Sequence, residues 1–333
     1  MPVKHWSFAG LMLTYWCNAR CESCYVCCGP KRREEMSIDF ALRVWRELTE
    51  ASPHGCRIHL SGGEPFGNWE RLIELCRRAH REKLGPLEKV ETNAFWATSA
   101  RIVRERLAAL DAAGMGKLTI SADPYHQQYI PIDRCRLAAR AAEEVLGPGR
   151  LQVRWRDWLV EGFDTSALDR AERSLLFARY AAQGRDRMIG RAANMLTTQP
   201  QRKSAEQFAD SPCWQRLLRS RHVHVGPDGR VMPGTCAGIV LGVAPAESVG
   251  GIWRRLGRSC LPGPTNGDAK QPSLAVLVRE GPVGLIETAG QAGFVPAAGY
   301  ADKCHLCWDI RRSLAGVGRF QDVFGPKWLY ESQ

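Results

Sequence analysis

The sequence predicts an α/β protein, with a partial (β/α)6 TIM-like barrel over residues 1–205 and a smaller α+β domain over residues 206–333. From residue 8 to about residue 190, short apolar runs alternate with amphipathic helical patterns, as the βα units of a parallel sheet require. A polar stretch at 194–212 and a different pattern after it place the boundary near residue 205. A chain of 333 residues is long enough for both parts.

The expected elements follow from apolar runs, caps and breakers. Strands are expected at 8–14, 57–60, 89–92, 117–121, 152–160 and 188–189. Helices are expected to begin near residues 37, 68, 99, 133 and 165. Ser37 and Ser99 have the side chains that cap helix N-termini, and Gly85 and Gly114 end helices. The last of these helices is expected to turn Leu168, Ala171, Leu175, Ala178 and Ala182 inward.

The C-terminal part has other signals. The run HVHVGPDGRVMP at 222–233 predicts a hairpin, and a loop rich in proline and glycine follows at 261–273. The longest uncharged stretch, 231–246, is broken by glycines and prolines and falls short of a membrane span. We therefore expect no membrane segment.

The net charge is +11, but the basic residues are scattered along helices rather than gathered in one arm. This pattern predicts a solvated basic surface, and no nucleic-acid-binding module is recognisable. The 13 cysteines do not form the framework of a small secreted domain, because the chain is long and lacks a signal peptide with a cleavage site. We expect a reducing, cytoplasmic location.

Three cysteines, Cys17, Cys21 and Cys24 in the run CNARCESC, carry the strongest chemical signal. Three thiolates at this spacing could hold three corners of a cubane iron–sulfur cluster and leave the fourth iron open. Zinc is the alternative, although structural zinc normally takes paired C-x2-C elements with four ligands. The run SGGEP at 61–65, about 40 residues on and after a predicted strand, favours the cluster.

In combination these motifs resemble those of the radical S-adenosylmethionine (radical SAM) enzymes, whose signature is C-x3-C-x2-C just after a first strand. The run GRA at 190–192 adds a third motif in the family's order, so the resemblance covers roughly residues 8 to 195. One departure is Ser23, where the family more often has an aromatic residue; Tyr25 could fill that role. The resemblance implies a [4Fe–4S] cluster on Cys17, Cys21 and Cys24, with S-adenosylmethionine (SAM) chelating the open iron.

The resemblance also implies where SAM would be held. Gly62 and Gly63 would let backbone carbonyls approach its ammonium group, and Glu64 would supply a charge; an ordinary strand-to-helix turn is the alternative. The further candidates for the cofactor lie after later strands, each with a structural role as the alternative: Asn93, Ser121, Asp123, and either Arg154 or Arg191 for the methionine carboxylate.

The loop DPYHQQY at 123–129 is polar and aromatic, and it follows a predicted strand. Loops at that end of a parallel barrel tend to carry function. Tyr125 and His126 are therefore candidates for substrate contact or proton transfer, with a packed loop and a satisfied histidine as the alternative. Cys27 and Cys28, just past the cluster motif, are bystanders or thiol hydrogen donors.

Four later cysteines, Cys213, Cys236, Cys304 and Cys307, resemble the auxiliary-cluster ligands of the SPASM and twitch extensions of radical SAM enzymes. No cysteine follows Cys307, so the short, single-cluster twitch version fits better. Four ligands would fully coordinate a second [4Fe–4S] cluster and suit it to electron transfer. Zinc remains an alternative for this set, and Cys260 could replace Cys213 as a ligand.

The resemblance implies an enzyme that cleaves SAM reductively and abstracts hydrogen from a substrate C–H bond, with a reductant such as flavodoxin or ferredoxin. A peptide or protein substrate is favoured, and a small metabolite is the alternative. Because the first strand begins by about residue 8, we expect no N-terminal leader-binding domain. RNA modification and a zinc-binding scaffold without activity are the remaining hypotheses.

Overall fold

The computed structural model describes residues 4–184, 186–195, 202–234, 236–259, 272–320 and 322–331. Its centre is an eight-stranded sheet in the order β5-β4-β3-β2-β1-β6-β7-β8. Neighbouring strands from β5 to β6 run parallel, and β7 and β8 complete the sheet antiparallel. The strands are β1 Phe8–Met12, β2 Arg57–Ser61, β3 Leu87–Thr92, β4 Lys117–Ile120, β5 Leu151–Val153, β6 His222–Val225, β7 Arg230–Pro233 and β8 Gly242–Val243.

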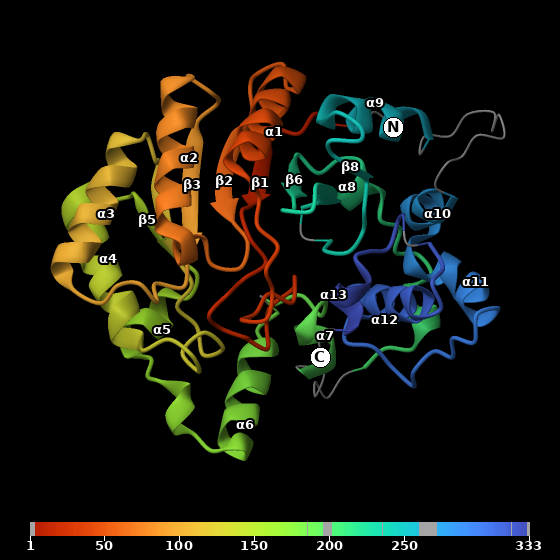
Figure 1. Cartoon of the computed structure of the whole chain (residues 1–333). Helices are drawn as coiled ribbons and strands as arrows, with labels where there is room; N and C mark the ends of the chain where they lie inside the picture. Colours follow the sequence, from red (N-terminus) through yellow and green to blue (C-terminus); the bar gives the residue numbers. More distant parts are fainter. Residues whose placement is uncertain are drawn as a thin grey trace.

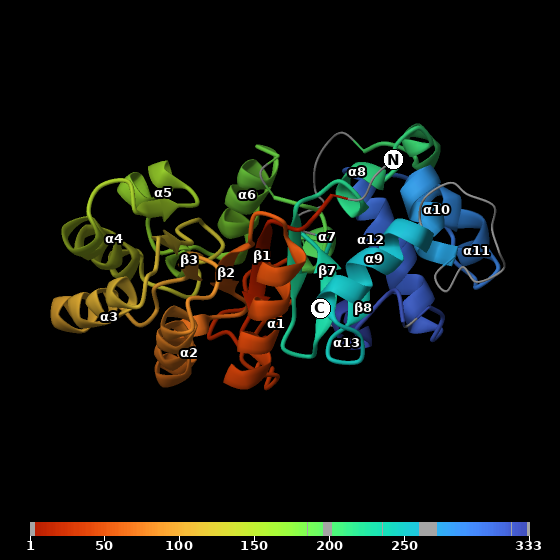
Figure 2. The same cartoon turned by 90° about the horizontal axis from the view of Figure 1, so that it is seen from above.

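Helices α1 Ile38–Ala51, α2 Trp69–Arg81, α3 Ala100–Ala112 and α4 Ile132–Leu146 lie along the outer side of the parallel strands, whereas α6 Arg170–Ala181 lies on the side opposite α1 and α2, as the view from above shows (Figure 2). The other helices of the N-terminal part are α5 Arg156–Glu161 and α7 Arg191–Met195. The C-terminal helices pack beyond β6 to β8 (Figure 1). They are α8 Trp214–Leu217, α9 Val249–Ser259, α10 Pro272–Glu280, α11 Ile286–Gly290, α12 Lys303–Gly316 and α13 Lys327–Glu331.

Local sequence explains where the first helices begin. The Ser37 hydroxyl accepts a hydrogen bond from the backbone N–H of Phe40, and Ser99 caps α3 in the same way through Ile102. Both N-caps were predicted and are confirmed. The apolar stripe of α1 is buried against the sheet, because a 3.6-residue period keeps its apolar side chains on one face.

Three expectations about the later elements are wrong. The fifth strand ends at Val153, and α5 replaces the rest of the expected strand at 152–160, because Trp155, Trp158 and Leu159 recur at a helical spacing. Residues 188–189 form a bend rather than a strand. Helix α6 buries Phe177 and Ala181, whereas Leu175, expected inside, is 75% exposed.

The strand that extends the parallel sheet on the other side of β1 is β6, from the C-terminal part. It pairs with β1 from Phe8↔His222 to Leu11↔Val225. The predicted hairpin at 222–233 is confirmed as β6 and β7. The mixed α/β class with a mostly parallel sheet is also confirmed, and both predicted parts of the chain contribute strands to this one sheet.

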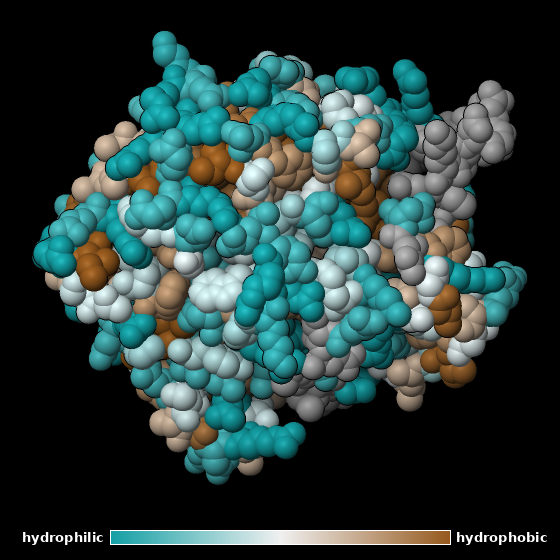
Figure 3. All heavy atoms as spheres, viewed as in Figure 1, coloured by the Kyte–Doolittle hydropathy of each residue, from teal (hydrophilic) through white to brown (hydrophobic). Residues whose placement is uncertain are grey.

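The face of the molecule seen in Figure 3 is mainly hydrophilic, and its hydrophobic residues lie in small separate patches. Among the described residues, no helix combines the length and the apolar character that crossing a bilayer would take. Residues 260–271, which include Cys260 and most of the predicted proline- and glycine-rich loop, lie outside the described residues.

Candidate functional site

A cavity of about 390 Å³ lies at the carboxyl ends of the parallel strands, where the loop after β1 folds over the sheet (Figure 1). Its walls come from the segments that follow β1 and β2, from the ends of β3, β4 and β5, and from Arg191. This is the end of a parallel sheet where active sites form, and the volume lies in the range of cofactor and ligand pockets.

Cys17, Cys21 and Cys24 all line this cavity, as their spacing predicts. Cys17 and Cys21 are buried, and Cys24 is partly exposed. Burial raises the pKa of the Cys17 thiol, and the neighbouring Cys21 raises it further. A metal centre reverses this effect, because ligand thiols bind metal as thiolates and release their protons.

The glycine turn after β2 packs directly on the cysteine loop. The backbone N–H of Gly63 donates to the Thr14 carbonyl at 2.6 Å, and that of Glu64 donates to the Trp16 carbonyl at 2.9 Å. A Cβ atom at Gly63 would overlap the Trp16 carbonyl, and Gly62 has a φ of +128°. The two glycines therefore let the turn lie against the loop backbone just before Cys17.

Glu64 is fully buried and does not line the cavity. Its carboxylate accepts hydrogen bonds from the Phe66 N–H at 3.2 Å, the Thr92 hydroxyl at 2.8 Å and the Asn93 N–H at 2.7 Å. Burial raises its pKa to about 7. The carboxylate thus ties the glycine turn to the end of β3.

Asn93 does line the cavity, and its side chain reaches the cysteine loop. Its amide nitrogen Nδ2 lies 2.9 Å from Asn18 Oδ1 and 3.7 Å from Cys17 Sγ. Ser121, after β4, lines the same cavity. The structure therefore gathers Gly62, Gly63, Asn93 and Ser121 around one space, as the sequence predicts.

A buried charged group lies at the β4 and β5 side of the cavity. Asp123 is fully buried, and both of its carboxylate oxygens lie 2.8 Å from His126 Nδ1. Arg154 pairs with Asp123 at 3.5 Å and with Asp186. Burial raises the pKa of Asp123, but His126 and Arg154 outweigh it and bring the value to about 2. His126 and Arg154 line the cavity, and Asp123 holds both in place.

Tyr125 points into the core, whereas its neighbour His126 lines the cavity. Its ring is fully buried against Phe177, its hydroxyl donates to the Phe177 carbonyl at 3.3 Å, and it does not line the cavity. Of the two candidates for substrate contact, the structure places only His126 at the cavity wall.

Arg191 is 2% exposed and forms part of the cavity wall. Its Nε donates to the Cys21 carbonyl at 2.9 Å, and its NH2 group donates to the Cys28 carbonyl at 2.7 Å. Within the described ranges it has no carboxylate partner. A buried cation needs a nearby negative charge, and thiolates of a bound cluster would supply it. The Ser23 hydroxyl is buried in the same wall and has no hydrogen-bond partner among the residues that the structure describes, which also fits a bound group.

The four later cysteines also come together. Cys213, Cys236, Cys304 and Cys307 line a second cavity of about 330 Å³. Cys304 and Cys307 lie in the first turns of α12, which Asp302 caps by accepting from the His305 N–H at 2.8 Å. Burial raises the pKa of Cys213 to about 12, and the neighbouring Cys307 adds to the shift. This crowding of buried thiols fits a metal centre that would take them as thiolates.

A second buried arginine accompanies this set. Arg311 is 1% exposed and donates to the Cys307 carbonyl at 3.3 Å, the Ala237 carbonyl at 2.8 Å and the Tyr330 hydroxyl at 2.9 Å. No carboxylate pairs with it in the part of the chain that the structure describes. The arrangement at Arg191 is thus repeated at the second cavity.

The segment from Asp186 to Arg191 lies between the two cavities. Asp186 lines the second cavity and pairs with Arg154 of the first, while Arg191 lines the first. Sequence reasoning missed Asp186, because no motif marks it and its role depends on long-range contacts. It also missed Arg311 and the place of Cys28 in the wall of the first cavity.

Residues 9–128 match the protein family described as "4Fe-4S single cluster domain". This stretch, about a third of the chain, is similar to that iron–sulfur cluster domain. The match covers the three cysteines, the glycine turn and the loop that carries His126. It confirms the predicted cluster and, with it, the resemblance drawn from the motifs.

Among curated proteins, the chain is similar to the "Putative peptide biosynthesis protein YydG" of Bacillus subtilis (strain 168), with 29% identity over 117 residues. The match covers 34% of this chain and 35% of that protein. The chain therefore aligns with about a third of the length of its curated relative.

Among solved structures, BtrN in complex with AdoMet and 2-DOIA aligns with a TM-score of 0.47 and 17% identity, over 87% of this chain and 91% of BtrN. AnSMEcpe with bound AdoMet and Cp18Cys peptide aligns with a TM-score of 0.44 and 12% identity, over 93% and 97%. Streptococcus suis SuiB bound to precursor peptide SuiA aligns with a TM-score of 0.40 and 12% identity, over 86% and 74%.

Replacing Gly63 should disrupt the first site. We expect Gly63→Ala to lose about four irons per chain after anaerobic reconstitution, because the added methyl group would push the Trp16 carbonyl and the cysteine loop apart. Gly290→Ala is the matched control, since a Cβ there meets nothing within 4 Å. Full iron content in Gly63→Ala would contradict the docking of the turn on the loop.

Replacing Arg311 should weaken the second site selectively. Arg311→Met keeps the length of the side chain but removes the buried positive charge, so we expect the metal bound by the four later cysteines to be lost. Arg312→Met, one residue along α12 and paired with Asp309 at the surface, serves as the control. Metal analysis of both variants after reconstitution checks this, and equal metal content would contradict the role of Arg311.

Proposed function

We propose that this chain is a radical SAM enzyme that modifies a peptide or protein substrate. The observation that carries the proposal is one cavity that gathers the three-cysteine loop, the docked glycine turn and polar side chains from the ends of three further strands. We also propose that the parallel strands of residues 1–205, with β6 as the sixth strand, form a partial (β/α)6 barrel, and that the rest of residues 206–333 forms a twitch-like auxiliary-cluster domain.

When bound, a reduced cluster and SAM would supply a 5′-deoxyadenosyl radical that abstracts hydrogen from a substrate C–H bond. Cys17, Cys21 and Cys24 would hold the cluster and leave one iron open. Backbone groups of Gly62 and Gly63 would face the SAM ammonium group.

The remaining residues would position SAM and the substrate. Asn93 and Ser121 would orient SAM through hydrogen bonds, and Arg154 would bind the methionine carboxylate. Arg191, whose guanidinium bonds the cysteine loop, would neutralise the cluster instead. Glu64 would act indirectly, by holding Asn93 and the glycine turn.

His126 would contact the substrate or move a proton. Its Nδ1 is held by Asp123, and its ring also hydrogen-bonds to Cys21 in the cavity wall. Burial lowers the pKa of His126, but the charges of Asp123 and Cys21 raise it well above its ordinary value. A protonated His126 would donate rather than accept a proton. Tyr125 would support this loop from the core.

The choice of a peptide substrate is supported by the similarity to the B. subtilis protein, whose name describes peptide biosynthesis. Oxidation of a small metabolite is the alternative that the same cavity would allow. A flavodoxin or ferredoxin would deliver the electron.

The second cysteine set would hold a fully coordinated cluster that accepts or relays an electron. A single zinc ion held by the same four thiolates is the alternative. The wall from Asp186 to Arg191 would separate the two centres.

The proposal predicts the products of anaerobic turnover. Wild-type protein with dithionite and SAM should form 5′-deoxyadenosine, faster when a candidate short peptide is present and with a matching change in peptide mass. Replacing Cys17, Cys21 and Cys24 together with alanine should abolish this product and lower the iron content from about eight to about four per chain. Liquid chromatography with mass spectrometry measures both products.

Cys76→Ala is the control, because Cys76 is buried on α2 and lines neither cavity. Cleavage retained in the triple variant would contradict the radical SAM proposal. Turnover of a small alcohol, with no response to peptides, would agree with radical SAM chemistry but contradict the proposal of a peptide substrate.

A further inference from the structure

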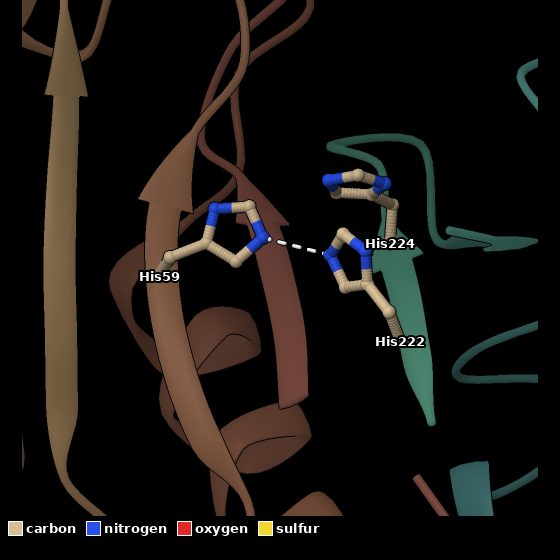
Figure 4. Close-up of side chains that lie close together, drawn as sticks. All are labelled: His59, His222 and His224. Atoms are coloured by element: carbon tan, nitrogen blue, oxygen red, sulfur yellow. Dashed lines mark hydrogen bonds between the residues drawn. The ribbon is translucent and has the colours of Figure 1, made fainter. Parts of the chain in front are cut away.

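Three histidine side chains converge on one point in the sheet, apart from both cysteine cavities. His59 comes from β2, and His222 and His224 come from β6, with β1 between them (Figure 4). Gly10 of β1 pairs with His59 on one side and with His224 on the other. The parallel pairing therefore aligns the two rings across the central strand.

The space that the rings occupy depends on Gly10. A Cβ atom at this position would overlap ring atoms of both His59 and His224. Any larger residue in place of Gly10 would push the two rings apart. The three strands thus leave room above Gly10, and imidazole rings fill it.

The ring nitrogens are close enough to bind one ion. One ligand nitrogen from each histidine lies within 4.8 Å of the other two, and His59 Nε2 lies 3.0 Å from His222 Nε2. Nitrogen ligands at about 2.0–2.1 Å from a tetrahedral zinc ion are about 3.3 Å apart. Small ring rotations would therefore close the three nitrogens around such an ion.

Two of the rings also have an oxygen atom beside their outer nitrogen. His59 Nδ1 lies 3.3 Å from Glu91 Oε1, and His224 Nδ1 bonds to the Gly234 carbonyl. Metal-binding histidines are usually oriented in this way, by a carboxylate or a backbone carbonyl on the nitrogen that does not bind the metal. Both contacts leave Nε2 for the shared centre.

The histidines are buried to different degrees. His59 and His224 are each 3% exposed, whereas His222 is partly exposed and gives access to the centre.

We propose that His59, His222 and His224 bind one Zn²⁺ ion, with a water molecule at the partly exposed fourth position. Three histidines are a known zinc ligand set, and imidazole suits this ion. None of the three histidines lines either cysteine cavity, but Glu91, which contacts His59, lines the first, so the ion lies beside that cavity. It ties β2 to β6 across β1 and thereby joins the N-terminal strands to the C-terminal hairpin.

The test uses protein with its iron–sulfur sites filled, purified anaerobically and dialysed against Zn²⁺ with a competing chelator. We expect one additional zinc per chain, with an X-ray absorption spectrum that shows nitrogen or oxygen neighbours at about 2.0 Å and no sulfur. His224→Gln should bind this zinc at least about tenfold more weakly, and Glu91→Gln should weaken it about 10- to 100-fold.

His54→Gln is the matched control, because His54 is exposed in the turn before β2 and is not one of the three converging histidines. Circular dichroism and iron content show whether His224→Gln is folded; if it is not, His222→Gln at the partly exposed position replaces it. No additional zinc in the wild-type protein, a sulfur-coordinated zinc, or equal zinc affinity in the folded histidine variant would each overturn the proposal.

Discussion

Two buried arginines impose the strongest constraint on this molecule. Arg191 and Arg311 are almost completely inaccessible, and neither pairs with a carboxylate among the described residues. Each instead donates to backbone carbonyls of a cysteine-bearing segment. Taking a guanidinium out of water without a partner costs several kcal/mol. Anionic thiolate centres in both cavities would offset that cost and would thereby couple metal binding to the folded state.

The central strand β1 explains how both cysteine cavities belong to one structure. Its carboxyl end leads into the three-cysteine loop. One of its edges pairs with β2 and the glycine turn, and the other edge pairs with β6. The C-terminal hairpin therefore extends the same sheet that carries the first cavity. The segment from Asp186 to Arg191 then contacts both cavities.

Local patterns predicted much of this arrangement. The cysteine spacing, the glycine turn and the caps at Ser37 and Ser99 depend on nearby residues, and the structure places them as expected. The expected strand at 152–160 is wrong because the apolar residues of this segment, two tryptophans among them, fit the two-residue period of a strand as well as the helical period. The structure adopts the helical spacing after Val153.

Contacts between residues far apart in the sequence could not be predicted from local sequence patterns. Nothing in the sequence around Glu64 shows that Phe66, Thr92 and Asn93 donate to its carboxylate. Nor does the sequence show that Tyr125 faces the core while His126 faces the cavity. The alternation in HVH places His222 and His224 on one face of a strand, which was a readable signal. Their approach to His59 required the pairing of β6 with β1, which joins segments more than 200 residues apart.

The central claim is that the first cluster has one iron without a protein ligand, which SAM chelates. Cys28 is the residue that could close this position, because it lies in the same wall as Cys24. Electron–nuclear double resonance on the reduced protein with SAM labelled with ¹⁵N in its amino group tests the claim directly. The account predicts a ¹⁵N hyperfine coupling of a directly bound ligand, in the wild-type protein and in Cys28→Ser alike. No coupling in the wild-type protein, or coupling that appears only in Cys28→Ser, would contradict it.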